Sequence, residues 1–255
     1  MALVTDDALT LAVSDYSETS QVVTLFTRLN GRLSVLAKGS KRPKNRFGGP
    51  VDRLQAVQAV FSVRPSGGLG QLTELCEQDA FAGLRTDLRS FYAASYVAEL
   101  VRATTEELDP HPEVFKMVID ALRRLSRGDK SDILLYRFEV RLLGALGLMP
   151  QWGTCVSCRR PRPAGPGGQP GRASFFSPAA GGVVCRRCRA RTGDGDGLDV
   201  SGKALDALAF LAEADDEKTE RVRLSAETAA DMRKLLRACW VHVLGREPRS
   251  LRWVP

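Results

Sequence analysis

Two regularly spaced cysteine pairs limit the folds open to this chain more than any other part of its sequence. The pairs are Cys155-Val-Ser-Cys158 and Cys185-Arg-Arg-Cys188, with 26 residues between them. A CxxC turn brings two sulfurs to the separation of neighbouring tetrahedral positions, so two such turns supply the four thiolates of a closed zinc site. The spacing therefore predicts a structural Zn²⁺ ion, with no coordination position left open for catalysis. The expected ligands are Cys155, Cys158, Cys185 and Cys188.

A redox pair and an iron–sulfur cluster are the alternatives to zinc. A thioredoxin-like CxxC begins a helix within a βαβ unit, and no such unit is predicted around either pair. Four thiolates also suit an iron–sulfur cluster, although nothing else in the sequence indicates electron transfer. The remaining cysteines, Cys76 and Cys239, occur among apolar residues, and we expect both in the core rather than at a metal.

A second feature is the basic stretch VLAKGSKRPKNRFGGP, from Val35 to Pro50, which contains no acidic residue. The whole chain has a formal net charge of +7, so its surface field attracts polyanions such as nucleic acid. A run of like charges repels itself and does not pack. It is therefore either a solvated loop or a loop that binds an anion, with Phe47 as a candidate for base stacking. Its cations are Lys38, Lys41, Arg42, Lys44 and Arg46.

Arginines also surround the cysteine pairs, and no acidic residue occurs from Pro150 to Gly193. Part of this charge offsets the net charge of about −2 on a zinc tetrathiolate. The remainder is available to phosphates. The arginines are Arg159, Arg160, Arg162, Arg172, Arg186, Arg187, Arg189 and Arg191.

Motifs of catalysis and membrane insertion are missing from the sequence. There is no Walker-type phosphate loop, and GDGDG, from Gly193 to Gly197, lacks the pattern of a Ca²⁺ loop. We therefore do not expect an enzyme. No apolar run approaches the length of a membrane span, and Asp6 and Asp7 stand where a signal peptide would carry basic residues. The expected location is cytoplasmic, in association with the nucleoid.

The first 80 residues are predicted to form strands, because short segments rich in β-branched residues alternate with turns such as Asn30-Gly31. Five strands with no helix among them favour a small barrel, and both OB-type and SH3-like barrels fit this spacing. The expected strands are Leu9–Val13, Val22–Thr27, Arg32–Ala37, Ala56–Val63 and Leu72–Cys76.

Helical periodicity begins after Phe81 and returns after the cysteine pairs. We expect a first helix with its apolar stripe on Leu84, Leu88, Tyr92, Tyr96 and Leu100. A second helix is expected to start after Pro112 and to end at Gly128, and a third to follow Ser131 and to stop near Gly147 to Pro150. Further helices are expected after Ser201 and after Ser225. The predicted domains are a barrel over residues 1–80, a helical domain over 81–154 and 194–255, and a cysteine module inserted at 155–193.

Three segments resemble the bacterial RecO family of recombination mediators. They are DYSETSQVVTLFTRLNGRLSVLAKGSKRPKNR (Asp15–Arg46), RFEVRLLGALGLMPQWGTCVSC (Arg137–Cys158) and FFSPAAGGVVCRRC (Phe175–Cys188). Ser17 departs from the glycine that the family usually has there, and many members lack some of the cysteines. The zinc prediction therefore depends on this sequence and not on the family.

The resemblance implies a DNA repair protein without catalytic chemistry, of α+β multidomain class, with an OB-type barrel, a helical domain and an inserted four-cysteine zinc module. Such proteins bind single- and double-stranded DNA and anneal complementary strands. They contact the acidic C-terminal tail of single-strand-binding protein and act with RecR to load RecA. We expect a monomer when the protein is alone. The alternative is a basic zinc-containing adaptor whose main role is protein contact.

With that resemblance, the basic loop becomes a phosphate-binding arm of the barrel. The residues expected to bind DNA are Lys38, Lys41, Arg42, Lys44, Arg46, Phe47, Arg159, Arg160, Arg186 and Arg187.

Overall fold

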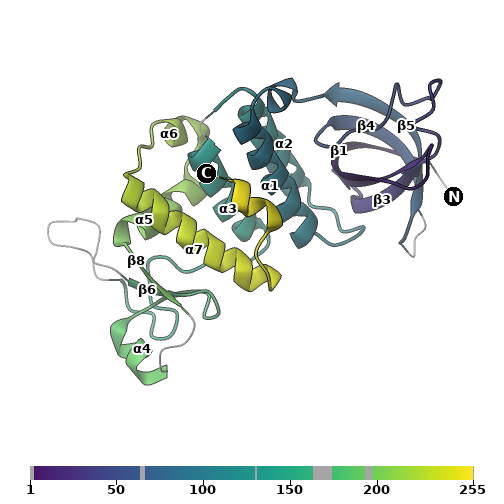
Figure 1. Ribbon diagram of the computed structural model, residues 1–255. Helices are drawn as coiled ribbons and strands as arrows, with labels where there is room; N and C mark the ends of the chain where they lie inside the picture. Colours follow the sequence, from purple (N-terminus) through teal and green to yellow (C-terminus); the bar gives the residue numbers. More distant parts are fainter. Residues whose placement is uncertain (1–2, 64–66, 130, 163–173, 193–196, 255) are drawn as a thin grey trace. The chain divides into compact units, whose positions relative to one another are not determined.

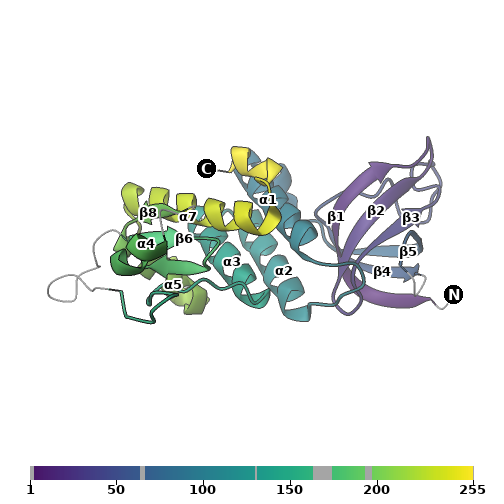
Figure 2. The ribbon, with the colours of Figure 1, turned by 90° about the horizontal axis from the view of Figure 1, so that it is seen from below.

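The computed structural model describes residues 3–63, 67–129, 131–162, 174–192 and 197–254 (Figures 1 and 2). The chain divides into two compact units. The first is Met1–Ser131 together with Ser250–Pro255, and the second is Asp132–Arg249. The domain boundaries expected at residues 80, 154 and 193 remain predictions. No helix in the described ranges is long and apolar enough to cross a membrane.

The first unit begins with a closed five-stranded barrel, drawn from purple to blue in Figure 1. Around the barrel the strand order is β1-β2-β3-β5-β4, and every pair is antiparallel except β3 with β5. This Greek-key order is that of an OB-type barrel, so the predicted fold class is confirmed. The strands are β1 (Val4–Asp15), β2 (Gln21–Thr27), β3 (Gly31–Ala37), β4 (Ala56–Ser62) and β5 (Gly70–Asp79).

Alternation of inward and outward side chains explains how these strands close. In β3 every second residue is buried, and the inward residues Leu33 and Val35 meet Leu25 and Val23 of β2 across the ladder. β1 pairs with β4 through Val4–Leu9 and with β2 through Ala8–Asp15, with a register shift between Thr10 and Ala12. This irregularity bends the strand and allows it to close the barrel, which leaves no free sheet edge.

Helices complete the first unit. The side chain of Asp87 accepts a hydrogen bond of 2.8 Å from the backbone N–H of Ser90 and so caps α1. α2 begins with Pro112 itself at its first position, just before the predicted start after this proline. The helical elements are η1 (Ala82–Arg85), α1 (Leu88–Thr104), α2 (Pro112–Ser126) and η3 (Arg249–Trp253).

The predicted stripe on the first helix is wrong at its N-terminal end. Leu84 is buried but belongs to η1, and Leu88 is 70% exposed. A strict four-residue spacing drifts by about 40° per step around an α-helix, so it does not stay on one face over several turns. Tyr96 and Leu100 of the predicted stripe are buried, and the buried face of α1 also includes Ala93 and Val97.

The second unit combines helices with a small sheet of strand order β7-β6-β8. Ser201 and Ser225 cap α5 and α7 by accepting hydrogen bonds from Ala204 N–H and Thr228 N–H. The elements are α3 (Ser131–Ala145), β6 (Ser174–Ser177), β7 (Gly182–Val184), α4 (Arg186–Thr192), β8 (Leu198–Val200), α5 (Gly202–Glu213), α6 (Asp216–Glu220) and α7 (Ala226–Leu244).

The two cysteines outside the CxxC pairs differ from each other. Cys239 is buried on α7 beside Trp240, as predicted, and burial with the nearby Glu139 carboxylate raises its pKa to about 12. Cys76 is exposed, which contradicts the expected core position. It lies in the part of β5 from Thr73 to Asp79, where no residue is fully buried. Apolar neighbours in the sequence therefore do not imply that Cys76 is buried.

Candidate metal centre and nucleic-acid interface

The four cysteines of the two CxxC pairs converge on one point of the second unit. Their Sγ atoms all lie within 4.8 Å of one another, and the Sγ atoms of Cys158 and Cys185 are 3.7 Å apart. Tetrahedral coordination with Zn–S bonds of about 2.3 Å places sulfurs about 3.8 Å from each other. The four side chains could therefore bind a metal ion as a closed tetrathiolate.

Backbone pairing brings the two CxxC segments together. The N–H of Gln151 donates to the carbonyl of Gly181, and the N–H of Val183 donates to the carbonyl of Gln151. Within the first CxxC pair, the N–H of Val156 donates to the carbonyl of Val183 at 2.9 Å. Gly182 has a φ of 156°, and a Cβ at this position would lie 2.6 Å from the carbonyl oxygen of Gln151. Only glycine allows this close approach, so Gly182 is a structural requirement of the site.

Tight turns orient the sulfurs themselves. In the first pair, Cys155 N–H donates to the carbonyl of Arg160, and Arg159 takes a φ of 61° to complete the turn. In the second, Cys185 directly precedes α4 and Cys188 lies in its first turn. The backbone N–H of Cys185 also donates to the sulfur of Cys155 at 3.3 Å. Such N–H donors stabilise thiolates, which are the forms that bind metals.

The pKa values of two thiols show how strongly the four groups interact. Burial favours a higher pKa for Cys155, but N–H groups of Cys185, Cys158 and Ser157 outweigh it and lower the pKa to about 6. The side chain of Cys188 hydrogen-bonds to Cys185, and this contact together with burial raises its pKa to about 12. Without a cation, the cluster therefore stabilises a thiolate at Cys155 and retains a proton at Cys188. A bound metal would displace the proton of Cys188.

Aromatic side chains lie near the CxxC segments, and one of them, Phe175, packs against the cysteine cluster. The rings of Trp152 and Phe176 are stacked at a centroid distance of 5.7 Å. The guanidinium of Arg189 lies 3.9 Å from the ring centroid of Phe175, and it also pairs with Asp199. Cys155 is 1% exposed and Cys188 6%, whereas Cys158 is exposed. The cluster therefore has a covered side and an open side.

The arginines of this module divide into two groups. Arg162 pairs with Asp206 and Arg189 with Asp199, so these two have structural partners. The predicted DNA-binding arginines are all exposed, and they are Arg159, Arg160, Arg186 and Arg187. Arg172 lies outside the described residues.

The basic stretch of the first unit is the loop between β3 and β4, which we call the basic loop, residues 38–55. Its side chains Lys38, Arg42, Lys44 and Arg46 are exposed. Lys41 is exposed too, but its Nζ lies 2.8 Å from the carboxylate of Asp15 at the end of β1. The stretch from Val35 to Pro50 contains no acid of its own, so this partner was not evident from the sequence.

A buried glutamine on β2 anchors both ends of the basic loop. Gln21 Oε1 accepts hydrogen bonds from Ser40 Oγ and from the backbone N–H of Val51, each at 2.9 Å. Its Nε2 donates to the carbonyl of Val51 at 3.2 Å. The loop therefore leaves and rejoins the barrel at fixed points. Sequence reasoning missed Gln21, which directly precedes the predicted strand Val22–Thr27 and continues the inward alternation of Val23 and Leu25.

An asparagine holds the tip of the basic loop. Asn45 Oδ1 accepts from the N–H groups of Phe47 and Gly49, and Asn45 Nδ2 donates to the carbonyl of Arg42. Phe47 packs partly against the barrel core, and the Arg46 guanidinium lies 5.5 Å from the centroid of its ring. These contacts organise the tip, so its cations extend from a shaped loop. Whether Phe47 stacks on a base remains a prediction.

Comparisons with known proteins cover nearly the whole chain. The sequence family described as Recombination protein O N terminal matches residues 1–78, and the one described as Recombination protein O C terminal matches residues 85–252. The DNA repair protein RecO of Desulforudis audaxviator is 32% identical over 245 residues, which are 96% of this chain and 93% of that protein. The protein of the same name from Myxococcus xanthus is 33% identical over 246 residues, or 96% and 94% of the two chains. That of Bacillus subtilis is 28% identical over 248 residues, or 97% and 92%.

Proposed function

The chain belongs to the recombination protein O family, and on that basis we propose that it binds single- and double-stranded DNA through the phosphate backbone and anneals complementary strands. Family membership supports a role in DNA repair and recombination, as a recombination mediator rather than a known enzyme. We further propose that it acts with RecR to load RecA on DNA covered by single-strand-binding protein, whose acidic C-terminal tail it contacts.

The observation that carries the DNA-binding proposal is the construction of the basic loop. Lys38, Arg42 and Lys44 are exposed and have no ion pair among the described residues. Gln21 ties the loop down at both ends, so these charges are held near one another at the barrel surface. Bringing two DNA strands together costs phosphate repulsion, and a fixed group of cations offsets this cost without occupying the edges of the bases.

We propose that the cysteine cluster binds a structural Zn²⁺ ion through Cys155, Cys158, Cys185 and Cys188. The sulfur separations and the all-thiolate donor set support zinc over harder cations, which prefer oxygen ligands. The ion would crosslink the two CxxC segments and so hold Arg159, Arg160, Arg186 and Arg187 on one small module. These arginines form the second phosphate-binding surface of the proposal.

A salt titration tests the role of the basic loop. The triple variant Lys38→Gln, Arg42→Gln and Lys44→Gln leaves the Lys41 pair with Asp15 in place, so the loop keeps its anchors. We expect weaker binding to every DNA sequence. The slope of log Kobs against log salt should fall by about 0.7 per lost contact on single strands and about 0.9 on duplexes.

The matched control removes the same charge from another surface. Lys218, Arg221 and Arg237 are exposed cations of the second unit, and their triple glutamine variant should bind DNA as the parent does. Equal affinity and slope for the loop variant and the parent would refute the loop as a DNA site. An equal loss of DNA affinity in both triple variants would show that the net charge of the protein, and not the basic loop, determines binding.

The adaptor function remains the second candidate, and one contact favours it. Lys41 already holds the carboxylate of Asp15, so the basic loop accepts carboxylates as well as phosphates. Competition between an acidic peptide and an oligonucleotide separates the two functions. Displacement of the peptide by DNA at equal charge concentrations supports DNA as the main ligand, and the reverse order supports the adaptor.

A further inference from the structure

Three aromatic rings, two of them on α1, lie in a row with a guanidinium group at each end, all within the first unit. The Cζ of Arg53 lies 4.7 Å from the ring centroid of Phe91, whose ring meets Tyr92 edge-on at 6.0 Å. Tyr92 stacks on Trp253 at 5.5 Å with an interplanar angle of 16°. The Cζ of Arg252 lies 5.0 Å from the Trp253 centroid. We call these five residues the α1 row.

Trp253 is the exposed aromatic residue of the row. Its side chain is 53% exposed, whereas the other two tryptophans of the chain, Trp152 and Trp240, are 8% and 0% exposed. Tryptophan carries a large apolar surface that folding normally buries, so one held open to solvent indicates a binding surface. Tyr92 stacks on one face of this ring and the Arg252 guanidinium lies over the ring, so a base would stack on Trp253 in place of that guanidinium.

Contacts at the base of η3 fix this ring in place. The backbone N–H and the hydroxyl of Ser250 both donate to the Glu99 carboxylate on α1. Tyr92, also on α1, supports the ring of Trp253 by stacking. Figure 2 shows the C-terminal turn alongside α1. The platform is therefore built into the fold, which lowers the entropy lost on binding a ligand.

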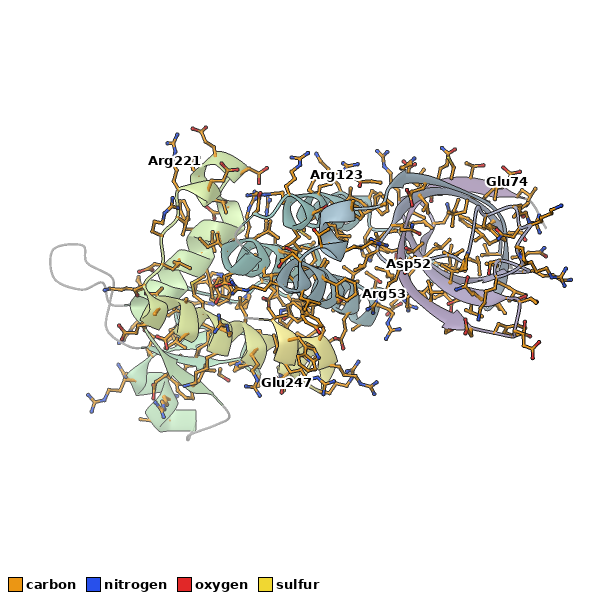
Figure 3. All side chains as sticks on the ribbon, turned by 45° about the horizontal axis from the view of Figure 1, so that its top comes forward. Asp52, Arg53, Glu74, Arg123, Arg221 and Glu247 are labelled. Carbon is orange, nitrogen blue, oxygen red and sulfur yellow. The ribbon has the colours of Figure 1, made fainter. Side chains whose placement is uncertain are left out.

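The charges at the two ends of the row are uncompensated. Arg53 and Arg252 are exposed and have no ion pair in the described part of the chain. Asp52 stands next to Arg53 in the sequence and in Figure 3, but its carboxylate pairs with Arg85 at 2.8 Å. Each unpaired guanidinium lies against an aromatic ring instead. The row thus combines an apolar flat surface with two free positive charges.

We propose that the α1 row is a binding site for single-stranded DNA in which a base stacks on Trp253 while Arg53 and Arg252 bind flanking phosphates. The nature of the ligand rests on the proposed function. Only Arg53 of the row belongs to the basic loop, and the row recognises a different feature from the loop cations Lys38, Arg42 and Lys44. Stacking needs an unpaired base face, which duplex DNA hides. The row therefore gives the protein a preference for single strands that phosphate contacts alone do not supply.

A protein ligand is the other occupant that an exposed apolar surface suggests. Leu88, one turn before Tyr92 on α1, is 70% exposed and would suit such a ligand. The unpaired arginines at both ends favour a polyanion with flat apolar groups, which describes single-stranded nucleic acid. We therefore assign the row to DNA, and make the protein ligand an outcome of the test.

Binding of the full-length chain to oligothymidylate and to a duplex of mixed sequence tests the site. We expect Trp253→Ala to weaken oligothymidylate binding at least about fivefold, the lower end of the effect of losing one stacked base. Duplex affinity and the salt slope should stay within error, because no phosphate contact is lost. Trp253→Tyr keeps an aromatic face and should restore most of the binding to single strands.

Tryptophan fluorescence adds a readout that depends on the site itself. Because Trp152 and Trp240 are buried, oligothymidylate should quench the emission of Trp253, and this quenching should vanish in Trp253→Phe. Thermal melting of each variant checks that the fold is kept.

Two results would overturn the proposal while leaving the proposed function intact. In one, the parent binds DNA and Trp253→Ala binds both forms equally well. In the other, an acidic peptide quenches Trp253 and oligothymidylate does not, which would assign the row to a protein. Absence of DNA binding by the parent would instead refute the proposed function.

Discussion

The barrel and the cysteine module both present exposed cations, but different forces hold them together. The barrel closes five strands around fully buried residues such as Val23, Leu25 and Phe61. The module has three strands of three or four residues each, and its apolar cluster is centred on Cys155, Val184 and Cys188. Burial of apolar surface is the main stabilising term of the barrel, and the proposed coordination of a metal by thiolates would be that of the module.

Because the supporting forces differ, the two basic surfaces should fail under different conditions. The basic loop is tied to the barrel by Gln21 and needs only the fold of its own chain. The arginines of the module need the proposed zinc ion to keep their backbone in place. Metal removal should therefore disturb only the arginines of the module, and a core mutation in the barrel should disturb only the basic loop.

Removal of the metal should have the largest effect. Cys188→Ala deletes a buried ligand, and structural zinc contributes about 10–16 kcal/mol to folding in small zinc modules at neutral pH. We expect loss of the bound metal and rapid hydrogen exchange over residues 174–190, with slow exchange retained over β2 and β3. Hydrogen exchange with mass spectrometry, together with a metal assay, measures both.

The exposed Cys76 supplies the matched control for that experiment. Cys76→Ala should keep one metal ion per chain and the exchange pattern of the parent. Unchanged exchange over residues 174–190 in Cys188→Ala would show that apolar contacts hold the module, contrary to our comparison.

A core substitution in the barrel should have the next largest effect on stability. It should destabilise the barrel and leave the cysteine module intact. Leu25 is fully buried, and Leu25→Ala should lower the free energy of unfolding of the barrel by about 2–5 kcal/mol through lost burial and a cavity. The metal content should not change. Leu29→Ala, at a position 64% exposed, should cost under about 0.5 kcal/mol.

Chemical denaturation followed by circular dichroism measures these costs. A fall in metal content of Leu25→Ala in native buffer would mean that the module depends on the barrel core. The two regions would then not be independent.

The smallest expected effect is a change in how metal affinity depends on pH. Without metal, Cys155 is already a thiolate above its pKa of about 6, so a metal displaces no proton from it there. Below that pH the metal must displace one more proton. The slope of log metal affinity against pH should therefore be steeper by about one below pH 6 than above it. Cys188, with a pKa raised to about 12, loses its proton to the metal throughout this range.

Competition with a chelator from pH 5 to pH 8 measures that slope. A constant slope across pH 6 would contradict the stabilised thiolate at Cys155. DNA binding by the basic loop has no such group and should not follow this profile.

Local patterns were sufficient to predict the barrel strands, the longer helices and the cysteine cluster. Alternation of apolar residues located β3, and the turn before it, where Gly31 has a φ of 69°, marked its start. Pro112 and the apolar period after it located α2. The CxxC spacing identified all four residues that converge in space. In each case the determining residues are neighbours in the sequence.

Contacts between distant segments were not predictable in the same way. The parallel pairing that closes the barrel joins Val35 to Gly70, and Lys41 finds Asp15 across a hairpin. Trp253 meets Tyr92 from the other end of the chain. A single sequence contains no local sign of such pairs, because each depends on how the elements pack.

The decisive experiment is a salt titration of DNA binding before and after metal removal. We assign phosphate binding to the basic loop, to the α1 row and to the arginines of the cysteine module, and only the last of these depends on metal coordination. We therefore expect the stripped protein still to bind DNA, with a shallower slope of log Kobs against log salt because the contacts of the module are lost. A slope unchanged by metal removal, or a complete loss of binding, would contradict this assignment.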